Sequence, residues 1–353
     1  MGGGWSRTVD EALAGGRNSF GLTRLLLALG VVLSHAGSVP TGRHTDEPLT
    51  VLTGFTLGEH AVNGFFAISG FLVAMSFVRR GWRDYVIARA LRIVPGLVGA
   101  VLVVALVLGA AMTRLPLGDY LASGALWRFI VQVLTTLKSA GALPGVFEVN
   151  PYPFAMGTVW TLKYEIYCYA GLVLAGVAGL LGQRRTALAA LAALFAAIIA
   201  LDWLAPDAGK AVQTSLRLPF LFATGSVIYL WRERVRLDWR IVAVLALATG
   251  LVAGTPLTKA LLFLTEAYGM LVFALGPVTH RLPEPEADLS YGIYLYGWPI
   301  QQAVFAAMPA TGAATQLGLS LVLTVVVAAA SWFAIEKPAL GLKSRLMALG
   351  RAG

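Results

Sequence analysis

The sequence predicts an all-α integral membrane protein, a bundle of about ten transmembrane helices with both termini in the cytoplasm. Three observations lead to this prediction. Only 13% of the 353 residues are charged, roughly half the share found in soluble domains, whereas 58% are hydrophobic. Apolar runs of ~20 residues recur from end to end, which is the length of a membrane helix and longer than the ~10-residue strands of a membrane barrel. Finally, the basic residues are concentrated in alternate loops.

Ten apolar segments can be delimited, and each is predicted to be a membrane-spanning helix. They cover residues 19–39, 60–79, 85–112, 158–181, 186–204, 215–231, 240–255, 258–278, 289–308 and 315–336. Several contain Gly or Pro, which membrane bundles tolerate because neighbouring helices satisfy the freed backbone groups. We expect the first segment to be retained and not cleaved as a signal peptide, because no clear small-residue cleavage pattern follows it.

The distribution of Lys and Arg predicts the orientation, because cytoplasmic loops are enriched in basic residues. With the N-terminus inside, 16 of the 27 basic residues fall in cytoplasmic segments, 6 in outer loops and 5 within or beside the spans. The cytoplasmic ones are Arg7, Arg17, Arg79, Arg80, Arg83, Arg184, Arg185, Arg232, Arg234, Arg236, Arg240, Arg281, Lys337, Lys343, Arg345 and Arg351. This asymmetry places both termini inside and accounts for the net charge of +9 without a nucleic-acid partner.

We expect a single transmembrane domain over residues 1–353, with a short cytoplasmic tail over 337–353 and no appended soluble domain. Residues 113–157 are predicted to form one long outer loop. Its apolar face either lies in the membrane interface, re-enters the bundle and roofs a cavity, or belongs to a surface helix packed on the bundle. The residues of this face are Leu126, Trp127, Phe129, Ile130, Val133 and Leu134. Since Cys168 is the single cysteine, an intramolecular disulfide is excluded.

Two ionisable residues lie in the first segment, where charges are costly and usually face a cavity or a partner. Arg24 is near the inner end and His35 toward the outer end, 11 residues later. Eleven residues make about three helical turns, so both side chains project from one face, about 16 Å apart along the axis. Each is therefore a functional candidate. The alternatives are a core histidine satisfied by a neighbour and an arginine that anchors the helix at the membrane surface.

A pair of arginines lies at the inner end of the third segment. In ARALRIVP, Arg89 and Arg92 are spaced i, i+3, which places them on one side of a helix. A guanidinium group suits phosphate because it makes two parallel charge-assisted hydrogen bonds. Together with Arg79, Arg80 and Arg83 just before them, the pair predicts a cytoplasmic phosphate clamp. The alternative is that these arginines only hold the loop inside.

A carboxylate marks the outer end of the fourth segment. In VWTLKYEIYCY, Glu165 follows Lys163 by two residues. Because a carboxylate at membrane depth requires a partner, Glu165 pairs with Lys163 or Arg24, orients His35, or lines a binding site for an acceptor.

Other motifs favour packing and give no sign of a metal. In NGFFAISGFL, residues 63–72, the small side chains of Ser69 and Gly70 are typical of close helix contacts. The aromatic residues of LSYGIYLYGWP, residues 289–299, form either an interfacial belt or a sugar-stacking surface. The remaining histidines lack ligand spacing, so we expect no metal site; they are His44, His60 and His280.

The ordered series of motifs resembles membrane acyltransferase family 3. The series consists of Arg24 and His35 with ten residues between them, then GFFAISGFL, RALRIVP, VWTLKYEIY, LSYGIYLYGWP and IEKP at residues 335–338. The resemblance runs over nearly the whole chain. Members of this family are integral membrane proteins that O-acylate cell-surface glycans and related acceptors.

The resemblance implies an acyl-CoA-dependent O-acyltransferase of the bacterial inner membrane. Acetyl-CoA is the simplest donor, and a carbohydrate or glycolipid hydroxyl is the acceptor. The family's first-helix histidine and arginine fall on His35 and Arg24, and its RxxR pair falls on Arg89 and Arg92. His35 is then the general base, or is itself acylated in a two-step route, while the Arg pair holds the donor's phosphates. Glu165 completes the candidate catalytic set. The acyl group, the acceptor and the oligomeric state stay open.

Two positions depart from the family pattern, and one rival function remains. Many members carry His where this chain has Gly297, and many carry Asp shortly before the arginine, where this chain reads NSFGLTR. The rival is a transporter or flippase for an anionic glycolipid or small anion. In it, Arg24, Arg89 and Arg92 line a path and His35 relays protons. The ordered motif series favours the transferase.

Overall fold

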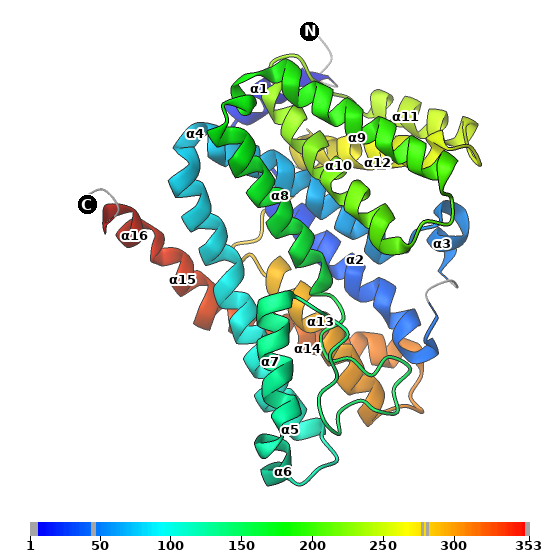
Figure 1. Cartoon of the computed structure of the whole chain (residues 1–353), viewed down its shortest axis with the longest axis vertical. Helices are drawn as coiled ribbons and strands as arrows, with labels where there is room; N and C mark the ends of the chain where they lie inside the picture. Colours follow the sequence, from blue (N-terminus) through cyan, green and yellow to red (C-terminus); the bar gives the residue numbers. More distant parts are fainter. Residues whose placement is uncertain (1–5, 44–46, 277–278, 280–281, 350–353) are drawn as a thin grey trace. The chain divides into compact units, whose positions relative to one another are not determined.

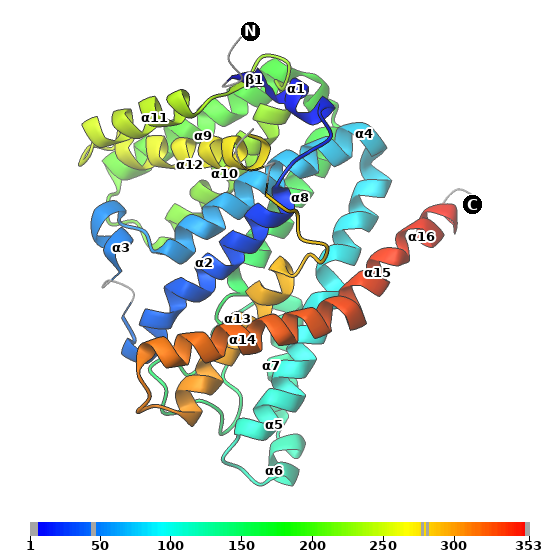
Figure 2. The ribbon, with the colours of Figure 1, turned by 180° about the vertical axis from the view of Figure 1, so that it is seen from behind.

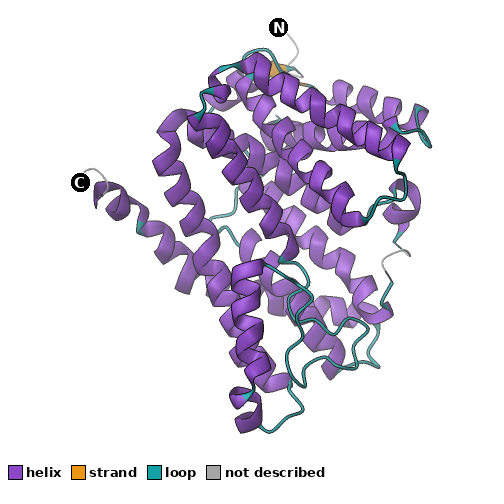
Figure 3. Ribbon diagram, in the orientation of Figure 1, coloured by secondary structure: helices purple, strands orange, loops and turns teal. Residues whose placement is uncertain are grey.

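The computed structural model describes residues 6–43, 47–276, 279 and 282–349, and helices dominate them (Figure 3). The elements before the fourth predicted span are β1 (Arg7–Thr8), α1 (Val9–Ala14), α2 (Phe20–Thr41), α3 (Pro48–Thr53), α4 (Leu57–Leu102), the π-helical η1 (Val103–Leu108), α5 (Gly109–Met112), α6 (Leu117–Ala122) and α7 (Gly124–Thr136). Those that follow are α8 (Trp160–Val177), η2 (Leu180–Gly182), α9 (Arg184–Leu204), α10 (Lys210–Leu230), β2 (Arg236–Leu237), α11 (Trp239–Leu251), α12 (Leu257–Leu275), α13 (Ser290–Ala307), α14 (Ala313–Ser331), η4 (Trp332–Glu336), α15 (Lys337–Gly341) and α16 (Lys343–Leu349). His44, His280, Arg281 and Arg351 lie outside the described residues.

Five helices among the described residues are long and apolar enough to cross a membrane. They are Phe20–Thr41, Leu57–Met112, Arg184–Leu204, Leu257–Leu275 and Ala313–Ala348. Each of the ten apolar segments expected from the sequence also coincides largely with helix. The chain is thus consistent with an α-helical membrane protein, while the number of spans and the side on which the termini lie stay predictions.

The longest of these helices is broken where the sequence predicts a loop between two spans. Gly81 in α4 has φ 82° and ψ 171°, a backbone conformation that residues with a Cβ atom rarely adopt. It separates the expected spans 60–79 and 85–112. The second arm carries Arg89 and Arg92.

The chain folds into two compact units, each assembled from segments distant in the sequence. Unit 1 comprises Met1–Arg24, Val62–Tyr85 and Tyr164–Pro285, and unit 2 comprises Leu25–Ala61, Val86–Lys163 and Glu286–Gly353. Two of the predicted site residues, Arg24 and Glu165, therefore belong to unit 1. The other three, His35, Arg89 and Arg92, belong to unit 2.

In unit 1, helices α9, α10, α11 and α12 lie side by side (Figure 1). Two glycines bring α10 against α4. A Cβ on Gly70 would lie 1.9 Å from the Phe222 carbonyl oxygen, and a Cβ on Gly225 would lie 2.0 Å from the Ala67 oxygen. The Ser226 hydroxyl also donates to the Gly70 oxygen at 3.0 Å. The prediction that Gly70 serves close helix packing is confirmed.

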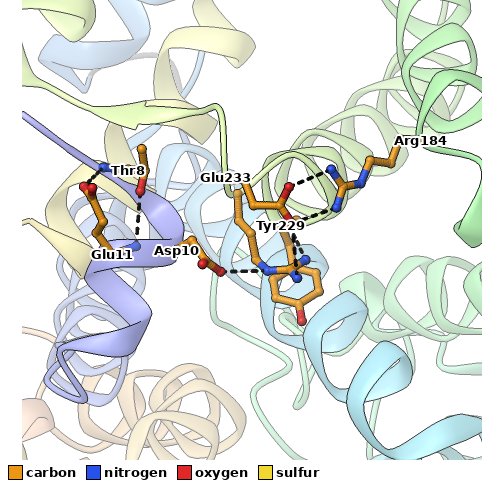
Figure 4. Close-up of polar contacts among 7 residues, drawn as sticks. Thr8, Asp10, Glu11, Arg184, Tyr229 and Glu233 are labelled. Atoms are coloured by element: carbon orange, nitrogen blue, oxygen red, sulfur yellow. Dashed lines mark hydrogen bonds and ion pairs between the residues drawn. The ribbon is translucent and has the colours of Figure 1, made fainter.

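The start of the described chain is hydrogen-bonded to the segment after α10. β1 pairs antiparallel with β2, with Arg7 opposite Leu237 and Thr8 opposite Arg236. α1 then begins with a capping box, in which the Thr8 hydroxyl accepts from the Glu11 N–H at 3.2 Å and the Glu11 carboxylate accepts from the Thr8 N–H at 2.8 Å (Figure 4).

In unit 2, α13 packs against α14, and α14 continues through η4 toward α15 and α16 (Figure 2). The helix pair meets at Gly292, where a Cβ would lie 2.9 Å from Ala328 Cβ. Close approach of the two backbones thus depends on a residue without a side chain.

Part of the predicted long outer loop forms helix α7, while the position of this loop relative to the membrane stays a prediction. Its apolar side chains Leu126, Phe129, Ile130 and Val133 are buried in a core cluster with residues of α4 and η1, whereas Trp127 is 50% exposed. The segment is therefore a helix packed on its own unit. Burial of four apolar side chains explains why this face, and not Trp127, turns inward.

Candidate active site

His35 lies in α2 with its ring against an indole from α13. The rings of His35 and Trp298 meet edge to face, with centroids 4.9 Å apart and planes at 90°. The histidine is half-buried. Contact with the indole restricts the orientation of the imidazole. A general base needs such an orientation, because its nitrogen must lie within hydrogen-bonding distance of the proton that it accepts.

The indole that supports His35 is itself fixed from several sides. Trp298 Nε1 donates to the Phe154 carbonyl oxygen at 2.9 Å, and the Phe154 ring stacks on the indole at 5.8 Å with an interplanar angle of 8°. A Cβ on Gly157 would lie 2.4 Å from the indole ring. The segment before α8 therefore holds Trp298 tightly, and any side chain at position 157 would displace it.

Helices α2 and α13 approach each other closely at Val32, about one helical turn before His35. Gln301 Nε2 donates to the Val32 carbonyl oxygen at 2.8 Å. A Cβ on Gly297 would lie 2.7 Å from Val32 Cγ2, closer than real Cβ atoms approach a neighbour. The absence of a side chain at Gly297 thus allows this helix contact. A histidine there would require the two helices to move apart.

Arg92 is surrounded by carboxylates and aromatic rings of unit 2. Its Nη2 donates to Asp288 Oδ2 at 2.8 Å, and its Nη1 lies 4.0 Å from Glu336 Oε2. The guanidinium carbon also lies 5.7 Å from the ring centroid of Tyr291 and 5.9 Å from that of Trp332. With a side chain only 16% exposed, Arg92 is a fixed, partly neutralised cation.

The partners of Arg92 are fixed in turn. Glu336, which is 2% exposed, accepts a hydrogen bond from the Ser331 hydroxyl at 3.1 Å. The Tyr291 hydroxyl donates to the carbonyl oxygen of Ile93, the residue after Arg92, at 3.0 Å. Burial of an ionised Glu336 carboxylate is costly, and the Arg92 guanidinium 4.0 Å away offsets part of this cost.

Arg89 lies one turn before Arg92 in the same arm of α4, and it is half-buried. The structure thus places both arginines of the RxxR pair in one helix of unit 2, as their spacing predicts. A Cβ on Gly96, one turn after Arg92, would lie 2.7 Å from the Tyr291 ring, so this glycine keeps α4 close to α13.

In unit 1, Glu165 belongs to a hydrogen-bonded group with Tyr169 and Ser69. The Tyr169 hydroxyl donates to Glu165 Oε1, and Ser69 Oγ lies 2.9 Å from the Tyr169 hydroxyl and 3.5 Å from Glu165 Oε1. The three side chains come from α8 and the first arm of α4. The carboxylate is therefore stabilised by hydroxyl donors, and Ser69 has a polar contact besides its packing role.

Arg24 lies near the start of α2, where another carboxylate acts as the helix cap. Glu284 accepts from the N–H of Gly21 at 2.5 Å and from the N–H of Leu22 at 3.3 Å. A carboxylate at a helix N-terminus satisfies orphan N–H groups and the helix dipole. The motif NSFGLTR has no local acid, and Glu284 supplies one at this end of the helix.

Several polar residues of these groups were not predicted from the sequence, among them Tyr169, Asp288, Glu336 and Glu284. Tyr169 is spaced i, i+4 from Glu165, a signal that their side chains meet on a helix. Asp288 immediately precedes LSYGIYLYGWP, and Glu336 is the acid of IEKP. Both lie in or beside motifs that the sequence analysis singled out, but neither motif indicates that the residue pairs with Arg92.

The structure is consistent with a helical membrane protein that carries arginines and a histidine in its apolar segments, and comparison with known proteins identifies its family. A family model described as an acyltransferase domain matches residues 17–335. The chain belongs to this acyltransferase family, which confirms the resemblance seen in the motifs. No solved structure matches the chain.

Three relatives match over nearly their full length. The chain is 30% identical to nodulation protein 10 of Rhizobium leguminosarum bv. viciae, over 96% of this chain and 97% of the relative. It is 24% identical to an O-acetyl transferase of Shigella phage Sf6, over 91% and 95%. It is 26% identical to the putative membrane-bound transacylase BcsY of Komagataeibacter xylinus, over 93% and 84%. The chain is thus an acyltransferase by family.

Proposed function

We propose that the protein transfers an acetyl group from cytoplasmic acetyl-CoA to a hydroxyl of a cell-surface or exported carbohydrate, with His35 as general base. The observation that carries the proposal is the family match over residues 17–335, which includes His35, Arg89 and Arg92. The similarity to an O-acetyl transferase supports acetyl as the group transferred and oxygen as the acceptor atom. The apolar helices support a location in a membrane, which we propose is the bacterial inner membrane.

In the proposed reaction, the neutral His35 imidazole accepts the proton of the acceptor hydroxyl while that oxygen attacks the thioester carbonyl carbon. The tetrahedral intermediate collapses, the C–S bond breaks, and the CoA sulfur leaves with the proton from the imidazolium. Trp298 fixes the ring orientation on which both proton transfers depend. In the two-step alternative the imidazole first takes the acetyl group itself and then passes it to the hydroxyl.

Arg89 and Arg92 are the proposed ligands of the donor's phosphates. Arg92 is held by Asp288 and Glu336, so its guanidinium is oriented before the donor arrives. A guanidinium has five N–H donors, which leaves hydrogen-bonding capacity beyond the bond to Asp288. Arg24, in the same helix as His35, is proposed to contribute positive charge for the thioester end of the donor.

Glu165 is proposed to act on the acceptor and not on the donor. Its carboxylate accepts from Tyr169 and lies within reach of Ser69, so it forms a polar group of the kind that binds sugar hydroxyls. Retention of CoA binding in Glu165→Gln, with a raised KM for the carbohydrate, is the expected result. A loss of CoA affinity would reject this assignment.

The deciding experiment is transfer of label from acetyl-CoA to carbohydrate by the purified protein in nanodiscs. We expect labelled carbohydrate in the wild type and a far lower initial rate of labelling with His35→Gln. The transporter alternative predicts no covalent label and no thermal stabilisation by CoA, because CoA is not its ligand. Stabilisation by CoA together with covalent labelling excludes that alternative.

A further inference from the structure

A basic cavity of about 490 Å³ opens in unit 1, and no residue assigned to the proposed reaction lines it. Its walls are residues 182–186, which include the first residues of α9, together with Trp231 and Arg234, which follow α10. α9 and α10 pack side by side, so the N-terminal end of one helix meets the C-terminal end of the other (Figure 1). Three arginines line it: Arg184, Arg185 and Arg234.

The acidic residue beside the cavity is already paired. Glu233 accepts from Arg184 through both carboxylate oxygens, at 3.0 and 2.9 Å, and lies 3.7 Å from Arg232 Nη2 (Figure 4). The hydrogen bond from Arg184 holds the pKa of Glu233 below its usual range, so it stays ionised and satisfied. Arg232 also donates to Asp10 at 3.0 Å. The pairing of Glu233 leaves the cavity with the exposed guanidinium groups of Arg185 and Arg234 and a net positive charge.

The cavity is built from side chains that fix one another. Trp231 Nε1 donates to the Arg184 carbonyl oxygen at 3.3 Å, and the guanidinium carbon of Arg234 lies 5.2 Å from the Trp231 ring centroid. An arginine stacked on an indole loses little further freedom when it binds an anion. The first turn of α9 adds the positive end of a helix dipole, and its N-cap residue, Gln183, makes no side-chain capping hydrogen bond.

The surroundings of the cavity point to a ligand at the membrane surface. α9 is long and apolar, yet only 6% of the residues in its most apolar 18-residue stretch are buried inside the protein. Its side chains are therefore available to contact lipid. The cavity lies at the end of this helix, where a membrane helix reaches the headgroups, and it contains a tryptophan, a residue enriched at that depth. The basic residues predict that this end faces the cytoplasm, the leaflet side where anionic lipids attract arginine.

We propose that this cavity binds the headgroup phosphate of an anionic phospholipid, with Arg185 and Arg234 as its principal ligands. The phosphate diester accepts charge-assisted hydrogen bonds from the two guanidinium groups, and the acyl chains lie along the apolar surface of α9. This site is independent of acyl transfer, because none of the residues proposed for that reaction lines the cavity.

The test uses the full-length protein in detergent, titrated with phosphatidylglycerol or phosphatidylcholine and analysed by native mass spectrometry and thermal unfolding. The variant is Arg185→Gln with Arg234→Gln. The matched control is Arg236→Gln with Arg240→Gln, which removes the same charge from exposed positions that do not line the cavity. We expect phosphatidylglycerol to bind and stabilise the wild type and the control. In the cavity variant its apparent Kd should rise roughly 30-fold, since each arginine near an anionic surface contributes about 1 kcal/mol.

Three results would overturn the proposal. Equal phosphatidylglycerol affinity in the cavity variant and the control would show that the cavity is not the site. Equal binding of phosphatidylcholine would show that the negative charge is not recognised. Competition by inorganic phosphate or CoA at the lipid's own concentration would show a soluble phosphate ligand instead. An unchanged thermal transition of the lipid-free variant serves as the folding control and does not depend on transferase activity.

Discussion

Arg92 in α4 donates to Asp288, two residues before α13, with Nη2 and Oδ2 2.8 Å apart. The same guanidinium faces Glu336 at 4.0 Å, so one arginine lies next to two carboxylates from the C-terminal part of the chain. This pairing changes how the RxxR motif is interpreted. Arg92 contributes to the structure of unit 2 as well as to any phosphate site, so its substitution alters stability and binding together.

The first prediction separates the structural role of Arg92 from donor binding. Arg92→Ala should lower the free energy of unfolding by about 3 kcal/mol, because it leaves the buried Glu336 without its cation. Adding Glu336→Gln should restore part of this loss, since the amide carries no charge and can still accept from Ser331. Thermal unfolding of the wild type, both single variants and the double variant in detergent measures the coupling. A double variant no more stable than Arg92→Ala would contradict the ion-pair assignment.

The second prediction tests Arg89 as a ligand of the donor's phosphates. Arg89→Ala should weaken CoA binding by about 1.5 to 3 kcal/mol, or roughly one to two decades in Kd, the contribution of a hydrogen bond to a charged group. Arg89→Lys should recover only part of the affinity, because an ammonium lacks the bidentate fork. Isothermal titration with CoA and dephospho-CoA measures the effect, with Arg240→Ala, at an exposed position outside the predicted clamp, as a control for lost charge. Equal CoA affinity in wild type and Arg89→Ala would leave only the anchoring role.

The third prediction concerns His35. His35→Ala and His35→Gln should lower the rate of acetyl transfer by roughly 10²–10⁴-fold, the usual contribution of a general base, because neither side chain takes up a proton at neutral pH. CoA affinity should stay unchanged. Initial rates at saturating acetyl-CoA and parallel CoA titrations provide the measurement, with His60→Gln as the control. Near-normal turnover of His35→Gln would reject the base assignment.

The fourth prediction tests the contact between α2 and α13. Gly297→Ala should destabilise the protein by about 1 to 3 kcal/mol, because its Cβ would lie 2.7 Å from Val32 Cγ2. Val32→Ala should rescue Gly297→Ala by making room for the added methyl group. Gly118→Ala, where no atom lies within 4 Å of the added Cβ, is the matched control. If the two substitutions at the contact simply add in thermal unfolding, the close approach is not limiting.

The fifth prediction concerns alkaline pH. Tyr120, which lies in α6 outside the predicted spans, donates to the Ala105 oxygen at 2.6 Å, and burial raises its pKa from 10.0 to about 12. The unfolded chain releases this proton first, so the contribution is complete below pH 10.0 and is lost as pH rises to about 12. Tyr120→Phe should be about 1 kcal/mol less stable at neutral pH and should lose less stability on alkalinisation. The free energy of unfolding of both proteins is measured across this pH range. An equal loss of stability in the wild type and Tyr120→Phe would refute the prediction.

The sequence predicted those features of the candidate site that depend on spacing within one helix. Arg89 and Arg92 share one arm of α4 and Gly70 forms a close helix contact, as predicted from i, i+3 spacing and from small residues. The pairing of Tyr169 with Glu165 has the same local origin, because an i, i+4 spacing places both side chains on one helix face. Such relations are fixed by helical periodicity alone.

The sequence by itself determined that the chain is helical, that it is suited to a membrane, and that it carries the ordered motifs of an acyltransferase. These properties reside in continuous apolar runs and in short motifs, so no knowledge of packing is needed. Only the tertiary structure decided that Asp288 and Glu336 hold Arg92, that Trp298 supports His35, and that α7 turns its apolar face into the core. Each of these contacts joins elements far apart in the chain, and its partner is selected by how closely the helices pack, which no local pattern specifies.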